Sequence, residues 1–537
     1  MNARRLLVRG RVFTADPEQP WVSAVVIDDG KIVFVGSADA VPVDPASCAV
    51  VDAGEGVVLP GFVDAHSHLL MTGQSLAKAQ LQSARDLDDI GRALVVWAAA
   101  NPDAPRVLGT GWTYSAVPGG RPTAAMLDRF IADRPAYVEA NDLHSNWVNT
   151  AALAELGIDD STPDPLGGEI VRDASGAATG HLLETASVEL VWRLLGRIDD
   201  ATRDQHLATV IDAYLAAGVT TAVDMALDAD DCAALVRAEV DGTLRLRVVA
   251  HWIVRRLGDP AAEAAQVERA AEMAARHRSD RFRIAGIKLV TDGTIDGCTA
   301  AMLDPYHDGS NASPIWDAES LQPIVRRAHE LGLQVAIHAI GDRAIRNAID
   351  AIEGAVGDDR DHRHRIEHLE YADESDTARL GRLGIVASMQ PVHVDPAIMD
   401  NWMAMLGDHR VERGFAWPEY RRGGAVLAFS TDSPTAPYQP LPNMYIATTR
   451  RSPSDPTLEP HRPDFAVSLA EAIGHATRDA AWASRGEESF GSLQVGLSGD
   501  LVVLDRDPFE QGPAVLPHIR PIVTISRGEI VHDRRDP

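Results

Sequence analysis

From about residue 200 onward, the chain alternates between short apolar stretches and longer stretches of helical length. The strand-like stretches are residues 219–223, 244–252, 284–290, 334–338, 364–368, 385–389 and 426–430. The helix-like stretches are residues 202–217, 261–278, 321–331, 342–355 and 373–383. Strands that alternate with helices of about ten to fifteen residues predict a parallel sheet. With this many repeats, the economical closure is a (β/α)8 TIM barrel, so the predicted fold class is α/β.

Both ends of the chain have a different sequence pattern, because they are rich in short strand-like segments. Residues 24–27 and 31–35 flank the turn Asp28-Asp29-Gly30, which is a hairpin signature. Residues 500–504 and 522–525 repeat this pattern near the C-terminus. We therefore expect the two ends to meet in one small sheet domain. Between the first barrel strand and about residue 200 the pattern is less regular, which predicts an insertion.

Charge and cysteine content exclude several classes of protein. The 537 residues include 50 Lys and Arg against 78 Asp and Glu, a formal net charge of −28. Nucleic acids and anionic membrane surfaces require clustered positive charge, so neither is an expected partner. Three widely spaced cysteines, Cys48, Cys232 and Cys298, indicate neither a disulfide framework nor a Cys-rich zinc site. Because no apolar run of membrane-spanning length occurs, we expect a cytoplasmic protein.

Histidines stand at the ends of the predicted strands. If residues 62–68 are extended, His66 and His68 present two imidazoles on one face, and neutral imidazole is a common metal ligand. A chance His-x-His pair on a surface strand is the alternative. In a barrel, reactive side chains lie at the carboxyl ends of the strands. Four further candidates end other predicted strands: Lys288, His338, His368 and Asp432. Their shared position favours a metal site.

At these residues the chain resembles the amidohydrolase superfamily, whose barrel motif is His-x-His, Lys, His, His, Asp in that order. It is most similar to amidohydrolase family 3, which includes N-substituted formamide deformylases. The motifs that carry the resemblance are LPGFVDAHSH, HSNWVN, KLVTDGT, IHAIGDRAI, RIEHLE, SMQP and GSLQVGLSGDLVVLD. The resemblance implies a metal-dependent barrel over residues 61–486. It also implies a small β-sandwich formed by residues 1–60 and 487–537, and an inserted α/β domain, about 75–195, covering the barrel mouth.

The resemblance also implies a binuclear centre with two divalent ions, zinc being the first choice. His66 and His68 would bind one ion together with Asp432, and His338 and His368 would bind the other. A lysine ammonium, with a pKa near 10.4, repels a metal, so Lys288 would first form a bridging carbamate with CO2. The alternative is an unmodified Lys288 paired with Asp292 or with a substrate oxygen, which leaves one metal.

The implied reaction is hydrolysis of an amide-type C–N bond in a small molecule, with an N-formyl or N-acyl amine as the first choice. A divalent ion lowers the pKa of water and polarises a carbonyl, and Asp432 would act as general base. Asp432 as a structural ligand only is the alternative. Cyclic amides, carbamates and esters stay open as substrates, as does a non-catalytic regulatory or binding role. Deamination is disfavoured, because barrel deaminases place Glu where this chain has Gly341.

Four further residues are candidates for substrate binding. His144 and Trp147 match a family motif, but either can instead pack inside the insertion. Asp292 and His393 follow barrel strands in loops, where they can contact the substrate or support the ligands. Gly341-Asp342 is more typical of a helix start than of a catalytic group. The sequence leaves the substrate, the metal and the oligomeric state open, a homodimer being one option.

Overall fold

The structure is a computed structural model that describes residues 5–141, 143, 145–165 and 168–535. The chain divides into two compact units. The first contains Met1–Leu69, Ile211–Ser433 and Pro437–Pro537, and the second contains Leu70–Val210 and Pro434–Ala436. Each unit has its own sheets and its own apolar core, and the predicted metal ligands all belong to the first.

Eight parallel strands form a nearly closed barrel in the first unit, which confirms the predicted fold class. Neighbours are hydrogen-bonded in the order β18-β17-β16-β15-β14-β13-β12-β5. The bounds are β5 (Phe62–Ser67), β12 (Val219–Leu227), β13 (Arg247–Ile253), β14 (Phe282–Val290), β15 (Gln334–Ala339), β16 (Arg365–His368), β17 (Val386–Met389) and β18 (Leu427–Phe429). All seven strand-like stretches predicted between residues 219 and 430 therefore correspond to barrel strands.

The barrel closes between β18 and β5 through residues that follow β18. Ser67 and Ser433 form a parallel bridge. The Asp432 N–H donates to the His66 carbonyl at 2.8 Å, and the His68 N–H donates to the Ser433 carbonyl at 2.9 Å. The backbone that completes the barrel is thus the backbone that carries three of the predicted ligands.

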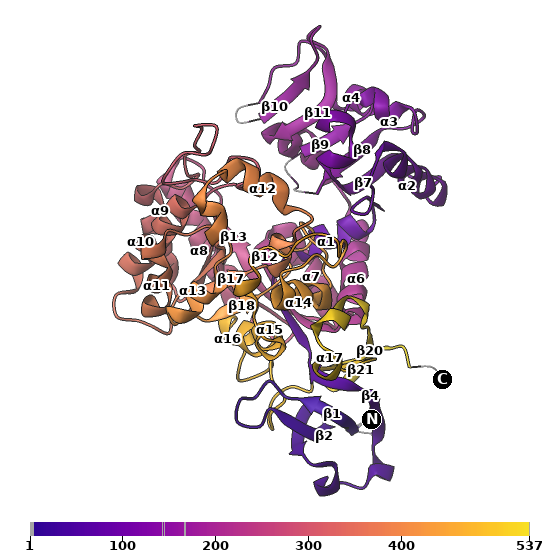
Figure 1. The fold of residues 1–537 in the computed structure, drawn as a ribbon, viewed down its shortest axis with the longest axis vertical. Coiled ribbons are helices and arrows are strands. Elements are labelled where there is room, and N and C mark those ends of the chain that lie inside the picture. Colours follow the sequence, from indigo (N-terminus) through magenta and orange to yellow (C-terminus); the bar gives the residue numbers. More distant parts are fainter. Residues whose placement is uncertain (1–4, 142, 144, 166–167, 536–537) are drawn as a thin grey trace. The chain divides into compact units, whose positions relative to one another are not determined.

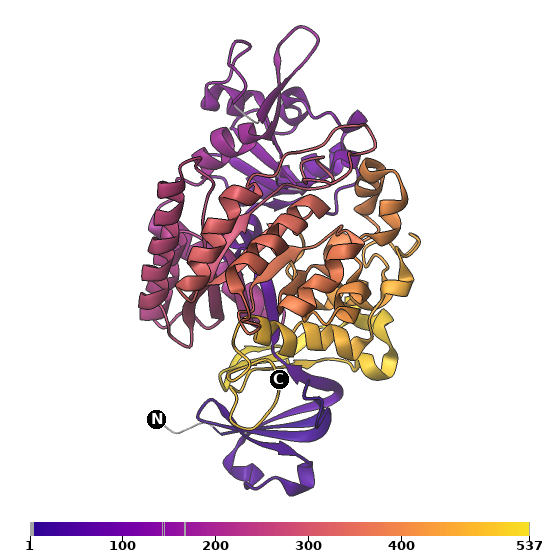
Figure 2. The same cartoon turned by 90° about the vertical axis from the view of Figure 1, so that its left-hand side faces the viewer.

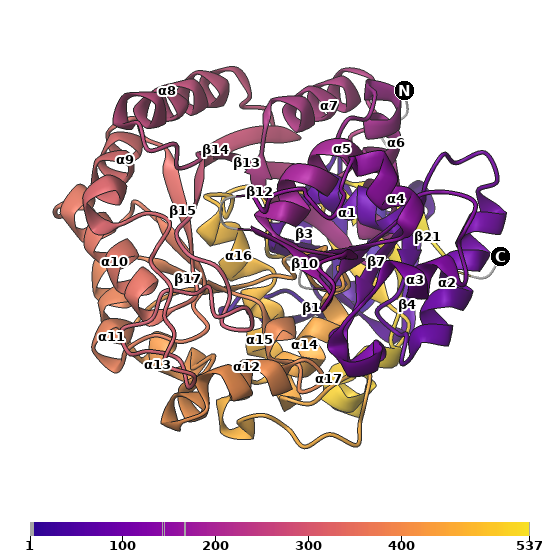
Figure 3. The ribbon, with the colours of Figure 1, turned by 90° about the horizontal axis from the view of Figure 1, so that it is seen from above.

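Helices surround the barrel strands, as Figure 2 and the view from above in Figure 3 show. They include α7 (Ala229–Val240), α8 (Pro260–Arg276), α9 (Ala318–Glu330), α10 (Asp342–Val356), α11 (Glu374–Leu383), α13 (Trp417–Arg422), α15 (Leu469–His475) and α16 (Arg478–Ala483). The additional helices are α12 (Met399–Leu406), α14 (Pro440–Thr449) and α17 (Pro508–Gln511). An Asp side chain caps the N-terminus of five of them, where backbone N–H groups lack helical partners: Asp228, Asp259, Asp317, Asp373 and Asp507.

Strands from both ends of the chain form one seven-stranded sheet, visible at the termini in Figure 1. Its order is β21-β20-β19-β4-β1-β2-β3. The bounds are β1 (Leu6–Phe13), β2 (Trp21–Asp28), β3 (Lys31–Gly36), β4 (Ala49–Pro60), β19 (Leu501–Leu504), β20 (Pro521–Ser526) and β21 (Glu529–Asp533). Asp29 and Gly30 join β2 to β3 with φ angles of 49° and 75°, as a two-residue hairpin turn requires. The antiparallel pairing of β19 with β4 unites the two ends of the chain.

The second unit is built around a six-stranded mixed sheet of order β10-β11-β9-β8-β7-β6. The strands are β6 (Ala79–Gln80), β7 (Val107–Trp112), β8 (Ala136–Ala140), β9 (Ser145–Val148), β10 (Gly168–Arg172) and β11 (Ala178–Glu184). Its helices are α2 (Leu87–Ala100), α3 (Ala124–Asp128), α4 (Thr150–Leu156) and α5 (Arg193–Leu195), while α1 (Leu69–Leu76) and α6 (Asp200–Ala216) contain the unit boundaries. Buried Leu94, Trp112 and Val138 are part of its core.

Within the described residues, no helix combines the length and apolarity that a membrane span needs. The three cysteines are free thiols.

Candidate metal centre

The six predicted ligands lie at or just beyond the carboxyl ends of barrel strands, where the side chains of a parallel barrel converge. They come from β5, β14, β15 and β16 and from the segments that follow β5 and β18: His66, His68, Lys288, His338, His368 and Asp432. Most of these side chains are almost fully buried, and His68 and His338 are about one-sixth exposed. The six predicted ligands therefore lie at one edge of the barrel.

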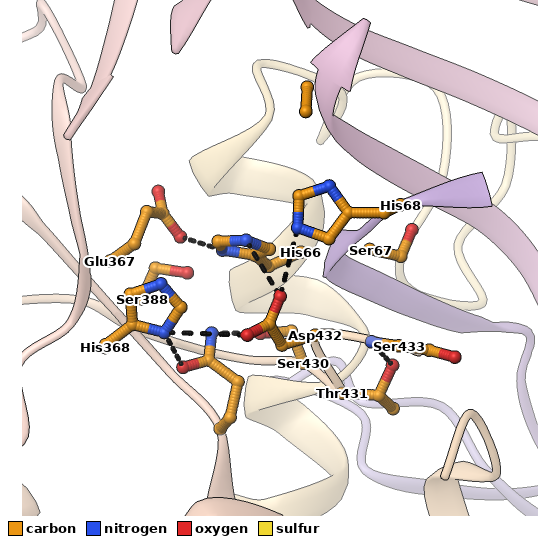
Figure 4. A network of polar contacts seen from close by, with 12 residues as sticks. His66, Ser67, His68, Glu367, His368, Ser388, Ser430, Thr431, Asp432 and Ser433 are labelled. Carbon is orange, nitrogen blue, oxygen red and sulfur yellow. Dashed lines mark hydrogen bonds and ion pairs between the residues drawn. The ribbon is translucent and has the colours of Figure 1, made fainter. Parts of the chain in front are cut away.

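Asp432 lies at the centre of this group (Figure 4). Its Oδ1 is 3.3 Å from His66 Nε2 and 3.2 Å from His68 Nε2, and its Oδ2 is 3.9 Å from His368 Nδ1. The surrounding imidazoles hold the pKa of the Asp432 carboxyl well below its ordinary value, although burial opposes them. Asp432 is therefore an anion among three imidazoles at neutral pH.

Burial keeps three histidines of the centre neutral, namely His66, His338 and His368. It lowers the pKa of His66 to about 4, with the charge of Lys288 as the next cause, and that of His338 to about 3. The pKa of His368 is also well below its ordinary value, for the same reason. A neutral imidazole has a free lone pair, which is the form that binds a metal ion.

Lys288 reaches the same point from β14. Its side chain is 2% exposed, and its Nζ lies 3.3 Å from His66 Nε2. Burial lowers the pKa of Lys288 to about 8, so the neutral amine is more accessible than in a lysine in water. This environment makes the lysine more nucleophilic at neutral pH.

His338 and His368 form the second histidine pair, with ring centroids 4.5 Å apart. His338 Nε2 is 3.3 Å from the Gly293 carbonyl, and His368 Nδ1 is 2.9 Å from Gln390 Oε1. Each of these oxygens accepts an N–H, which assigns the proton to that ring nitrogen. Nδ1 of His338 and Nε2 of His368 are then the nitrogens with free lone pairs.

Two residues of the centre have a left-handed backbone, which is rare outside glycine. The φ angle is 75° at His368, where β16 ends, and 56° at Asp432. Such conformations cost about 1–3 kcal/mol each and persist only where the surrounding structure holds them. The strained backbone therefore coincides with two of the candidate ligands.

His393 also belongs to this group, although the sequence suggested it only as a substrate contact. Its Nε2 lies 3.6 Å from Asp432 Oδ2, and its ring stacks on that of His368 at a centroid distance of 5.8 Å. Its Nδ1 is 3.8 Å from Glu370 Oε1. Burial raises the pKa of Glu370 to about 8, and the Trp402 indole N–H donates to its carboxyl at 2.8 Å.

Asp292, the other loop candidate, is engaged with backbone. Its carboxyl accepts N–H groups from Ala301, Ile340 and Gly341 at 3.1, 3.1 and 2.9 Å. One of its oxygens is also 3.4 Å from His338 Nε2. Gly341 and Asp342 begin α10, as the sequence indicated, but it is Asp292 that accepts the N–H of Gly341. Asp292 thus connects the loop after β14 to the start of α10.

Of the two candidates from the HSNWVN motif, the structure describes only Trp147, which lies in the second unit. His144 is outside the described residues. Trp147 is fully buried on β9, where its indole N–H donates to the Thr123 carbonyl at 2.8 Å and its ring packs 5.8 Å from Trp112. The described contacts of Trp147 are therefore those of a core residue.

Sequence reasoning missed the residues that hold the ligands in place. Glu367 Oε2 lies 2.7 Å from His66 Nδ1, and Arg365 binds the same carboxylate. Asp64 accepts the backbone N–H and the hydroxyl of Thr431, which precedes Asp432. The alternation of side chains along a strand could have indicated two of them. Asp64 lies two positions before His66, and Arg365 lies two positions before Glu367, so each shares a face of its strand with that residue.

The donor atoms fit a divalent metal ion. Two sets of three donors lie within 4.8 Å of one another, and they share Asp432: His66 with His68, and His368 with His393. Neutral imidazoles combined with a carboxylate are the ligands that zinc and related ions accept in proteins. The side chains present can therefore hold a metal.

Known proteins are similar to this chain along almost its whole length. Residues 49–532 match the amidohydrolase family. The Bacillus subtilis protein YtcJ, named as an amidohydrolase, is 29% identical over 98% of each chain. An N-substituted formamide deformylase from Arthrobacter pascens is 27% identical, again over 98% of each chain. The crystal structure of an uncharacterized metal-dependent hydrolase from Pyrococcus horikoshii superposes with a TM-score of 0.76 and 25% identity, covering 98% of this chain and 100% of that one.

The family match spans the barrel, the second unit and the part of the terminal sheet from β4 onward, and the structure gathers a candidate set of metal ligands at the barrel edge. This chain belongs to the amidohydrolase family.

Proposed function

We propose that this protein is a metal-dependent hydrolase that cleaves the C–N bond of a small amide-type substrate, with an N-formyl or N-acyl amine as the first choice. The observation that carries the proposal is the convergence of His66, His68 and His368 on the Asp432 carboxylate. The similarity to an N-substituted formamide deformylase along almost the whole chain supports the choice of substrate class.

The residues that would hold the metal are those of the centre. His66 and His68 offer Nε2 atoms to one ion together with Asp432, and His338 and His368 offer their free ring nitrogens to a second ion. When bound, a divalent ion would lower the pKa of water to near neutrality and polarise the scissile carbonyl. Zinc is the ion that this donor set favours first.

Asp432 is the residue that we expect to move protons. Its carboxylate is ionised at neutral pH, so it can take a proton from the attacking water. The water oxygen then bonds to the carbonyl carbon, the C–N bond breaks, and Asp432 passes its proton to the leaving nitrogen. The products are a carboxylic acid and an amine, so atoms and protons balance.

We further propose that Lys288 becomes a carbamate that bridges two ions. In this reaction the Nζ of the neutral amine bonds to the carbon of CO2 and releases one proton to the solvent, which gives an anion with two oxygen donors. Support comes from the position of Nζ, which is buried and only 3.3 Å from the metal-binding nitrogen of His66. An ammonium at this point would repel a cation, whereas a carbamate would attract two.

Two loop residues complete the proposed site. His393 faces Asp432 and can contact the substrate there, while Asp292 supports His338. Gly341 argues against deamination, since a Cβ at that position would lie 2.3 Å from the Ala301 carbonyl oxygen and no side chain fits. His144 stays a proposed substrate contact, whereas the buried position of Trp147 does not support that role for its side chain.

We also propose a cytoplasmic location, a small-molecule substrate and a homodimeric assembly. A cytoplasmic location is supported by the three free thiols. The high negative charge supports a small-molecule substrate rather than nucleic acid or an anionic membrane. A homodimer is the assembly that sedimentation should test first.

One experiment tests the proposed function. The purified chain is loaded with Zn²⁺, its metal content is measured, and its turnover is followed on N-formyl amines, N-acyl amines, a cyclic amide, a carbamate and an ester. We expect bound zinc and fastest turnover on an N-formyl or N-acyl amine. Bound metal with turnover only on esters would move the activity to another bond, and neither metal nor turnover would favour a binding protein.

A further inference from the structure

A buried arginine and glutamate occupy the barrel interior beneath the candidate metal centre. Arg365 and Glu367 lie two positions apart on β16, so their side chains share one face of the strand, which is the inner one. Both residues are 0% exposed. Arg365 donates to Glu367 Oε1 from Nε at 2.5 Å and to Oε2 from a terminal nitrogen at 3.1 Å. The guanidinium therefore donates hydrogen bonds to both oxygens of the carboxylate.

This ion pair connects β16 to the adjacent strand β17 and to β5, which is not adjacent to β16. The same terminal nitrogen of Arg365 donates to the Ala65 carbonyl on β5 at 2.7 Å and to Ser388 Oγ on β17 at 2.6 Å. Glu367 Oε2 lies 2.7 Å from His66 Nδ1, a contact visible in Figure 4. Three strands are thus connected through two side chains.

Stability alone does not account for this arrangement. Removing two charges from water costs several kcal/mol per ion, and apolar residues of similar size often stabilise a protein as well or better. The pair does, however, place a carboxylate at hydrogen-bond distance from one particular nitrogen of one candidate ligand. That contact decides which nitrogen of His66 carries the proton.

We propose that Glu367 is a positioning residue that fixes His66 for metal binding, and that Arg365 holds Glu367 in place for this task. The inference rests on the metal centre of the proposed function. Glu367 accepts the proton of His66 Nδ1, so the lone pair of Nε2 points toward Asp432 and Lys288. The negative charge behind the ring also increases the basicity of Nε2 as a ligand.

Three substitutions separate this role from a purely structural one. Glu367→Ala removes the acceptor, Glu367→Asp keeps the charge but withdraws it from His66 by one methylene, and Glu367→Gln keeps an oxygen acceptor without the charge. The matched control is Glu263→Ala. Glu263 is also a buried glutamate with an arginine partner, Arg256, but it accepts backbone N–H groups at the start of α8, and none of its described hydrogen bonds or ion pairs is with a histidine.

The measurement is the affinity of the full chain for Zn²⁺, determined by competition with a chelator, with circular dichroism to confirm folding. We expect Glu367→Ala to weaken Zn²⁺ binding about 10- to 100-fold, as loss of a partner behind a ligand does. Glu367→Asp should lose nearly as much, Glu367→Gln should recover part of the affinity, and Glu263→Ala should bind like the parent.

Parent-like affinity in folded Glu367→Asp or Glu367→Ala would overturn the inference, and so would an equal loss in Glu263→Ala. Because Glu367→Asp keeps a negative charge near the buried Arg365, it serves if the alanine variant does not fold. Amide turnover is recorded separately. A parent that binds Zn²⁺ but hydrolyses no amide would overturn the proposed reaction and leave this inference standing, whereas a parent that binds no Zn²⁺ overturns both.

Discussion

Asp64 and Thr431 are joined by two hydrogen bonds, although they lie at opposite ends of the barrel sequence. The Thr431 N–H donates to Asp64 Oδ1 at 2.9 Å, and its hydroxyl donates to Oδ2 at 2.6 Å. The Tyr214 hydroxyl adds a third bond to the same carboxyl at 3.2 Å. Asp64 thus anchors the segment that carries Asp432, whose left-handed backbone requires support from its surroundings.

Replacing Asp64 by alanine should therefore weaken both the fold and the metal site. The substitution leaves buried donors of Thr431 without an acceptor, which costs about 1–3 kcal/mol. We expect the free energy of unfolding to fall by about 2 kcal/mol in urea titrations, and Zn²⁺ affinity to fall because Asp432 loses its position. Tyr214→Phe, which removes only the weakest of the three bonds, is the control, and parent-like Zn²⁺ affinity in Asp64→Ala would contradict the anchoring role.

Removing the Lys288 side chain should reduce the metal content. If a carbamate on Lys288 bridges two ions, Lys288→Ala should retain one ion per chain or fewer, measured by elemental analysis. Acetate in the buffer should restore part of the second ion, because it supplies the missing carboxylate. Lys78→Ala serves as control, since Lys78 pairs with Glu139 in the second unit at 2.8 Å. Two ions retained in Lys288→Ala would refute the bridge.

Asp432→Asn should separate metal binding from proton transfer. The amide cannot accept a proton as a carboxylate does, and a positioned general base contributes about 10²- to 10⁴-fold to the rate. We expect kcat on the best amide to fall by at least about 100-fold even when excess Zn²⁺ restores the metal content. Recovery of most of the activity with the metal would show that Asp432 is a ligand only.

The order of strands and helices could be read from the sequence because most barrel strands are short apolar stretches that alternate with helices. The stretch 385–389, for example, is observed as β17 from Val386 to Met389. Helix α7 was not predicted, because its sequence begins Ala-Asp-Asp-Cys and shows little apolar periodicity. Its start is fixed instead by the Asp228 cap.

The candidate ligands could be predicted because each stands at the end of a strand, and the ends of the strands can be located from the sequence alone. Glu367 and Gln390 were not predicted, because each acts through a contact with a histidine on another strand. His393 appeared only as a loop residue, and its closeness to Asp432 depends on how that loop folds back. Contacts of this kind depend on the closed barrel, and local patterns do not contain them.

His393→Asn should distinguish a substrate contact from a metal ligand. We expect the metal content to stay at the parent level, and kcat/KM on the best amide to fall about tenfold, the effect of roughly one lost hydrogen bond to a charged group. The measurements are elemental analysis and steady-state kinetics on the same preparation. A loss of metal in parallel with activity would instead make His393 a ligand, as its 3.6 Å distance to Asp432 allows.

His251 should make stability depend on acid. This buried histidine on β13 bonds to Gln334 at 3.0 Å, and burial lowers its pKa to about 3 from 6.5. As the pH falls from 6.5 toward 3, the unfolded chain binds a proton that the folded chain does not, so stability is lost in this window at about 1.4 kcal/mol per pH unit. His251→Gln, measured by urea unfolding in the presence of a chelator, should reduce the pH slope by about that amount. An unchanged slope in His251→Gln would contradict the assignment.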